Sequence, residues 1–273
     1  MANLSITQAW NETAEFVRRE AGLLFPIAFL LVALPGGIVQ LFVPEPGGTP
    51  AEQVGRLLML IPLGLVAGIL GMIGTIALTY LALQPGASVG EALKVGGRRF
   101  LMLLAASLLI VLGLIASLIP LVAVFMALGV REGVTPTGAT ASAVFLIFLV
   151  YLIGLAALWV RLMLMTPVAA VENAGPIAII RRSWNLTAGH FWKLLGFLLL
   201  FLLAALVVLI AFSAVVGIFL ALLVGRPEPG TTAMIIFMLV TALFQSAFSL
   251  VLVTLVARIY AQLAGTKLPE VFV

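Results

Sequence analysis

The sequence predicts an all-α integral membrane protein with six transmembrane helices, and three observations favour this fold class. Of the 273 residues, 64% are hydrophobic and 9% are charged, whereas a soluble domain is nearer half apolar and a quarter charged. The apolar residues form long continuous runs, without the alternation of an outer-membrane strand. The few basic residues gather between alternate runs. This composition excludes a soluble enzyme, a disordered chain and a nucleic-acid-binding domain, so no nucleic acid is expected as a partner.

The six spans follow from the lengths of the apolar runs. A bilayer core of about 30 Å requires roughly 20 apolar helical residues. Six segments are long enough: 21–43, 57–83, 100–128, 141–164, 192–224 and 234–257. The connections between them are short, so residues 1–273 are expected to form a single membrane domain.

The orientation of the chain follows from its basic residues. The termini, the second and fourth connections and the adjoining span ends hold 11 Lys and Arg residues, and the opposite connections hold 3, namely Arg56, Arg131 and Arg226. The positive-inside rule therefore places both termini in the cytoplasm. The aromatic residues expected to anchor this side are Trp10, Trp159, Trp184, Trp192, Tyr80 and Tyr260.

Three amphipathic segments precede the first, third and fifth spans, and they begin near Ser5, Ser88 and Pro176. Each is expected to form a separate helix in the cytoplasmic interface, and Ser88 with Glu91 forms a capping box. The chain then divides into three units, at about 5–83, 88–172 and 176–264, and these units predict a threefold internal repeat. The alternative is that any amphipathic linker before a span looks alike.

Each segment is expected to lie in the cytoplasmic interface with its apolar residues on one face. In the first segment this face carries Ile6, Ala9, Trp10, Thr13 and Val17, and in the third it carries Ile177, Ile180 and Trp184.

The search for catalytic chemistry is negative. There is no Cys, one His (His190), and the ten acidic residues are all Glu. No metal site, cofactor or catalytic residue is therefore predicted. A membrane enzyme remains an alternative only if Arg161, Glu172 and His190 converge in one pocket.

The arginines are the candidates for contact with lipid headgroups or other anions. Six of them lie in or beside the amphipathic segments, and two lie at span ends: Arg18, Arg19, Arg98, Arg99, Arg181 and Arg182, then Arg161 and Arg258. A guanidinium group within a span indicates function by default. The alternative is that Arg161 and Arg258 extend to the headgroups only to escape the apolar core.

Small residues mark helix contacts or breaks. Gly64, Gly68 and Gly71 follow one face of the second span and are expected to allow close helix packing, with the wall of a lipid-sized cavity as the alternative. The Pro35-Gly36-Gly37 sequence is expected to interrupt the first span.

One stretch around the fourth connection is more specific than the composition. Its motif residues are Glu172, Ser183, Trp184, Leu186, Thr187, Phe191 and Trp192. The stretch resembles the membrane-domain family of glycerophosphoryl diester phosphodiesterase and the related YciC-like six-span proteins. The resemblance implies a bacterial inner-membrane protein without the catalytic domain, which is a separate soluble unit in that family.

The function expected from these observations is non-enzymatic: the protein binds or organises lipid, or scaffolds a partner, in the inner membrane. Membrane lipids are the expected partners, and another membrane protein or a second copy of the chain is the other partner class considered. The alternative function is transport of a lipid or small apolar solute, because of the interrupted span, the glycine stripe and the repeat.

Overall fold

The computed structural model describes residues 4–43, 50–130, 137–225, 228 and 230–265, and it contains no strand within them. The helices in chain order are α1 (Ile6–Ile27), the π-helix η1 (Ala28–Ala33), α2 (Leu34–Leu41), α3 (Pro50–Leu83), α4 (Val89–Ala127), α5 (Gly138–Leu162), α6 (Met165–Val171), α7 (Pro176–Ala188), α8 (Phe191–Leu223) and α9 (Thr232–Ala264). Arg131, Arg226 and Lys267, and the side chain of Arg56, which the sequence assigns to membrane sides, lie outside the described residues.

Six helices in the described part of the chain are long and apolar enough to cross a membrane, which confirms the predicted fold class. The backbone N–H of Ser5 donates to Gln262 Oε1 at 3.0 Å, so the two ends of the described chain lie on one side. An even number of crossings requires this arrangement.

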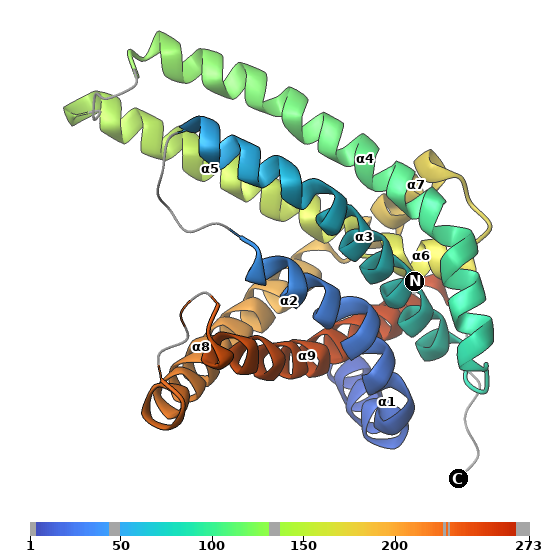
Figure 1. Cartoon of the computed structure of the whole chain (residues 1–273). Coiled ribbons are helices and arrows are strands. Elements are labelled where there is room, and N and C mark those ends of the chain that lie inside the picture. The colour runs from blue at the N-terminus through green and yellow to red at the C-terminus, as the bar shows by residue number, and fades with distance from the viewer. Residues whose placement is uncertain (1–3, 44–49, 131–136, 226–227, 229, 266–273) are drawn as a thin grey trace.

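The spans diverge from a common end rather than forming a closed bundle. In Figure 1, α4 and α5 extend in one direction and α8 and α9 in another, both from the region around α6 and α7. The accessible surface is 16264 Å², whereas a compact soluble chain of this mass exposes about 11,000 Å². The additional surface is largely apolar, as expected for helices solvated by lipid.

Two of the three amphipathic segments are not separate helices, contrary to expectation. The helix that begins at Ile6 continues into the first span, and α4 runs unbroken from Val89 to Ala127. Neither segment ends in a proline or a turn, so the backbone has no reason to leave the helix. Only α7 is separate from the span that follows it, because Gly189 and His190 interrupt the helix.

The first span is irregular, but it is not broken at Pro35. The chain widens into η1 just before this residue and continues as α2 through Gly36 and Gly37. Proline lacks an N–H, and its ring clashes with the carbonyl of the fourth residue before it. A π-helical turn at that place relieves the clash without breaking the span.

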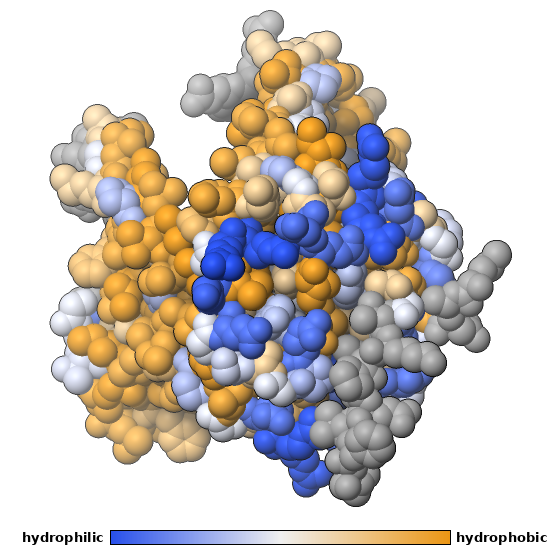
Figure 2. Space-filling view, turned by 90° about the vertical axis from the view of Figure 1, so that its right-hand side faces the viewer, coloured by the Kyte–Doolittle hydropathy of each residue, from blue (hydrophilic) through white to orange (hydrophobic). Residues whose placement is uncertain are grey.

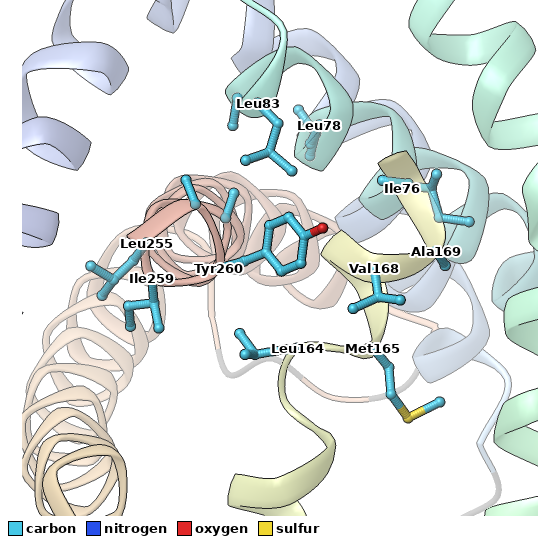
Figure 3. Packing of buried hydrophobic residues seen from close by; sticks show 14 of the residues in the cluster. Ile76, Leu78, Leu83, Leu164, Met165, Val168, Ala169, Leu255, Ile259 and Tyr260 are labelled. Carbon is cyan, nitrogen blue, oxygen red and sulfur yellow. The ribbon is translucent and has the colours of Figure 1, made fainter. Parts of the chain in front are cut away.

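The core lies where the ends of three helical spans meet. α5 ends at Leu162, and the short α6 that follows buries Met165, Pro167 and Val168. Figure 3 shows Met165 and Val168 between the end of α3 and the end of α9. The labelled members of this cluster are Ile76, Leu78, Leu83, Leu164, Met165, Val168, Ala169, Leu255, Ile259 and Tyr260. The sequence did not predict α6 as a separate element.

The close helix contact in α3 lies one turn beyond the predicted glycine stripe. A Cβ added at Gly64 or Gly68 would meet nothing within 4 Å, so neither glycine packs within the described chain. At Gly71 an added Cβ would lie 3.9 Å from the carbonyl oxygen of Leu31, an ordinary contact. At Gly74 it would lie 2.7 Å from the Leu31 side chain, so the first span fits against α3 only because residue 74 is glycine.

The face with which α7 packs on the core is not its apolar face, and in α1 the two faces overlap only in part. α7 buries Ile179, Ser183 and Thr187, whereas Ile177 and Trp184 are exposed. These three buried residues recur every four positions and are small or β-branched, which allows close approach to the core. Similarly, α1 buries Ala9, Thr13 and Phe16 and leaves Trp10 exposed. The large apolar side chains of α7 therefore face outward, where lipid lies.

Candidate functional site

Glu172 ties three helices together on the side of the molecule where the chain ends lie. Its Oε1 accepts a hydrogen bond from the Tyr260 hydroxyl at 2.7 Å and from Arg182 Nε at 3.0 Å. The Arg99 guanidinium donates to its backbone carbonyl. Residues of α4, α7 and α9 thus meet at one glutamate, those of α7 and α9 at its carboxylate and that of α4 at its backbone.

The local sequence explains why Glu172 is available for these bonds. α6 ends at Val171, and the backbone of Glu172 directly after it is extended at φ −90° and ψ 141°. Pro176 then begins α7 at the first helical position, where a missing N–H costs nothing. The short non-helical link between them turns the carboxylate toward the start of the next helix.

The motif residues surround Arg161, the basic residue at the end of α5. The Ser183 hydroxyl donates to the Arg161 carbonyl oxygen at 2.7 Å, and Ser183 is fully buried. The Arg161 guanidinium lies 5.2 Å from the centre of the Trp184 ring and 5.1 Å from that of Phe191. Cation–π contacts of this kind hold the charge at the helix end without an acidic partner.

The other motif residues support this arrangement. The Thr187 hydroxyl lies 3.0 Å from the carbonyl oxygens of both Ser183 and Trp184, and it closes the last turn of α7. Leu186 packs against the core, while Trp192 is 79% exposed and contacts the Phe191 ring edge-on. The motif residues Ser183, Trp184 and Phe191 thus form a structural clamp around Arg161, and Trp184 and Trp192 are its exposed aromatic residues.

Within the described residues, no hydrogen bond or ion pair joins Arg161, Glu172 and His190, the three residues on which the enzyme alternative depends. Glu172 is bonded to Arg182 and Tyr260, and Arg161 stacks on two aromatic rings. No hydrogen bond or ion pair joins either residue to His190, which precedes α8 at its N-cap. Within the described residues no three His, Cys, Asp or Glu side chains are placed to hold a metal ion.

Three of the candidate arginines are exposed and free of partners. Among the described residues, Arg18, Arg98 and Arg181 are exposed and make no hydrogen bond or ion pair, whereas Arg19 pairs with Glu20 at 3.1 Å. We call Arg18, Arg98 and Arg181 the arginine collar. Figure 2 looks onto this side of the molecule and shows hydrophilic residues gathered between apolar flanks.

Arg181 borders a hollow of about 470 Å³ on this side. The hollow is lined by Glu172, Ala174, Ile177, Ala178, Arg181, Arg182 and Asn185. The Glu172 carboxylate neutralises Arg182. The charge of Arg181 is not neutralised, so the hollow has a net positive charge. A headgroup with a phosphate fits that charge.

Arg258 is placed differently from the expectation. It is 8% exposed, and its guanidinium lies 5.0 Å from the centre of the buried Phe16 ring. Its Nε has no hydrogen-bond partner among the described residues. Arg258 is therefore more enclosed than the other candidate arginines, and its contact with a lipid headgroup stays a prediction.

In each of the three predicted units, the end of the second span contacts the first helix of another unit. Three contacts between side chains share this relation: Tyr80 with Glu91, Arg161 with Trp184, and Arg258 with Phe16. They link the first unit to the second, the second to the third and the third back to the first. The threefold repeat stays a prediction, and this ring of contacts is what it would produce.

A second hollow, of about 490 Å³, opens between α4 and α5, and we call it the lateral groove. It is lined by Ile110, Gly113, Leu114, Ser117, Val150, Tyr151, Gly154, Leu155, Leu158, Leu162, Ile180 and Trp184. Its polar side chains, Ser117 and Tyr151, lie 3.1 Å apart at their oxygens, and Ser117 also donates to the Leu114 carbonyl. The groove is thus apolar except for one satisfied hydroxyl pair and the indole N–H.

Sequence reasoning missed Tyr260, Ser117 and Tyr151 as members of these sites. Tyr260 is 3% exposed and bonded to Glu172, so it is not the interfacial anchor expected. Tyr260 lies between Arg258 and Gln262, and this group of polar residues at the end of an apolar span could have marked it as part of a polar site. For Ser117 and Tyr151 the signal was that each is a polar residue within an apolar run.

The fold and these sites define a multi-pass α-helical membrane protein. The chain belongs to the family described as "Domain of unknown function (DUF7847)", whose model matches residues 4–263. No curated protein and no solved structure matches the chain. The resemblance to the phosphodiesterase membrane domain stays a prediction.

Proposed function

We propose that this protein is a non-enzymatic membrane protein that binds and organises anionic lipid at the cytoplasmic face of a bacterial inner membrane. Both termini lie in the cytoplasm in this proposal, since the arginine collar then faces the leaflet rich in negative charge. The observation that carries the proposal is the collar itself: three exposed guanidinium groups, one each from α1, α4 and α7, that have no bonded partner among the residues the structure describes.

Charge and depth support this reading of the collar. Each arginine near an anionic membrane surface contributes about 1 kcal/mol of attraction. The collar lies beside apolar helix faces, as Figure 2 shows for the side around α7. A lipid can therefore place its chains on the apolar flank and its phosphate at the collar. The exposed Trp184 and Trp192 suit the headgroup level of a bilayer.

Lipid that co-purifies with the protein tests the proposal. Wild-type protein, extracted gently and analysed by mass spectrometry, should hold more phosphatidylglycerol relative to phosphatidylethanolamine than the membrane it came from. The triple variant Arg18→Gln, Arg98→Gln, Arg181→Gln should lose this enrichment, because the phosphate contacts are removed.

Arg19→Gln provides the matched control, since Arg19 already pairs with Glu20 and is not in the collar. It should keep the enrichment of the wild type. Absence of enrichment in the wild type, or equal loss in Arg19→Gln and the triple variant, would refute the proposal.

Transport of a lipid is the second candidate, and the lateral groove favours it. A passage would have to continue beyond the Ser117–Tyr151 pair to the far leaflet. A lipid-scrambling assay with the reconstituted protein distinguishes the two functions: an organiser leaves lipid exchange between leaflets at the rate of empty vesicles, and a transporter raises it.

A further inference from the structure

The lateral groove between α4 and α5 has the dimensions of one lipid chain. It follows α5 from Val150 to Leu162, which is about 18 Å at 1.5 Å per helical residue. One leaflet of a bilayer core is about 15 Å deep. The groove therefore begins at the level of α7 and reaches the middle of the membrane.

The walls of the groove are open because glycines face it from both sides. A Cβ added at Gly113 of α4 or at Gly154 of α5 would meet nothing within 4 Å. Neither glycine is required by helix packing, unlike Gly74. Because neither residue has a side chain, the two glycines leave a slot between the helices in which a flexible chain fits.

The chemistry of the lining selects an apolar occupant. The deep end holds the Ser117 and Tyr151 hydroxyls, and the Ser117 hydrogen is already used by the Leu114 carbonyl, so Tyr151 donates to Ser117. Because the two hydroxyls already bond to each other, they do not require a polar ligand. A hydrocarbon chain matches the apolar lining, whereas a sugar or a peptide backbone would leave its own polar groups without partners.

Positive charge lies at the other end of the groove. Arg161 belongs to the face of α5 that carries Val150, Gly154 and Leu158, because these positions recur at helical spacing. Its guanidinium stacks on Trp184, which itself lines the groove. It is half-buried and donates one hydrogen bond, to the Trp184 carbonyl at 3.4 Å, so most of its N–H groups remain free.

We infer that the lateral groove binds one acyl chain of an anionic phospholipid from the leaflet on the side of α7, with Arg161 at its phosphate. Arg181 lines the separate hollow beside Glu172 and is not part of this site. This inference rests on the proposed function and adds to it a specific lipid site, distinct from general attraction to the collar.

Trp184 reports directly on the occupant of the groove. The variant Trp10→Phe, Trp159→Phe, Trp192→Phe leaves it as the only tryptophan, and all three replaced rings are exposed. The protein is reconstituted in phosphatidylcholine vesicles with a minor fraction of phosphatidylglycerol, and either lipid carries brominated chains that quench tryptophan on contact. Brominated phosphatidylglycerol should quench Trp184 beyond its share of the lipid, and Arg161→Gln should lower this preference about fivefold.

Filling the groove should displace the lipid. Gly154→Phe and Gly113→Leu approach from opposite walls, and either should reduce quenching of Trp184 by brominated phosphatidylglycerol to that of bulk lipid. Gly217→Phe in α8 is the matched control, since a Cβ there also meets nothing within 4 Å and Gly217 lies outside the groove. It should leave the quenching unchanged.

Three results would overturn the inference. Equal quenching by the two brominated lipids in the wild type removes the selectivity for anionic lipid. Unchanged quenching in both groove variants removes the site, and if the collar variants still lose co-purified phosphatidylglycerol the proposed function stands without it. Quenching below that of bulk lipid in the wild type, together with chemical cross-linking of two copies that Gly154→Phe abolishes, assigns the groove to a second copy of the chain.

Discussion

Replacing Glu172 with alanine should destabilise the protein more than removing any one of its partners. The carboxylate accepts from the Tyr260 hydroxyl and from Arg182, and Tyr260 is 3% exposed. The substitution leaves a buried hydroxyl without an acceptor. That condition costs more than the loss of a hydrogen bond between two groups that water can reach.

The two bonds contribute unequally. An unsatisfied buried hydroxyl costs about 1–3 kcal/mol. The pair with Arg182 contributes about 0–1 kcal/mol, because the two side chains are 45% and 29% exposed. Glu172→Ala should therefore lower the free energy of unfolding by about 1–4 kcal/mol. Arg182→Gln should lower it by less than about 1 kcal/mol.

A double-mutant cycle in detergent micelles, with unfolding followed by circular dichroism during denaturant titration, measures the coupling. Tyr260→Phe removes the hydroxyl that Glu172→Ala strands, so the double variant should be more stable than the sum of the two single effects predicts. A coupling energy of about 1 kcal/mol or more is expected. Additive effects, or an Arg182→Gln effect as large as that of Glu172→Ala, would show that the Tyr260 bond is not the main one.

Three further predictions concern packing, the Arg161 clamp and membrane orientation. Gly74→Ala should destabilise the protein by about 1–3 kcal/mol by overpacking, because its Cβ would lie 2.7 Å from the Leu31 side chain, while Gly68→Ala should be close to neutral in the same thermal unfolding assay. Ser183→Ala should cost about 0.5–1.5 kcal/mol, since it removes the bond to the Arg161 carbonyl, and equal stability of this variant and wild type in denaturant titration would contradict the role given to Ser183. The chain has no cysteine, so a single cysteine at Asn185 should react with an impermeant maleimide only from the cytoplasmic side of oriented vesicles, and one at Ser142 only from the opposite side; the reverse pattern would contradict the proposed orientation.

The six spans could be predicted from the sequence because their signal is local. An apolar run of sufficient length has few other folds available in a membrane. Where the helices start and stop was harder to predict. The change from the charged residues 18–20 to the apolar residues that follow indicates where the chain enters an apolar environment. It does not indicate a backbone turn, and α1 continues through it. Pro35 does perturb the backbone, and the chain responds with a π-helical turn rather than a break.

The candidate site was only partly predictable. Glu172, Ser183 and Arg161 lie within 23 residues of one another, and a local motif marked them. Tyr260 is 88 residues from Glu172, so their bond depends on how α9 packs against α6 and α7. Helix packing also explains why Arg258 and Arg161 have different surroundings, although each lies at the end of a span in the sequence. One lies against Phe16 in the core and the other at a groove mouth.

The ratio of anionic to zwitterionic lipid that remains with the wild-type protein, relative to the same ratio in its native membrane, tests the central claim most directly. The protein is excised in polymer nanodiscs and its lipids are measured after exchange of the loosely held ones. The arginine collar predicts a ratio above that of the membrane. A ratio equal to or below that of the membrane would contradict the account, because unpaired Arg18, Arg98 and Arg181 would then bind no phosphate.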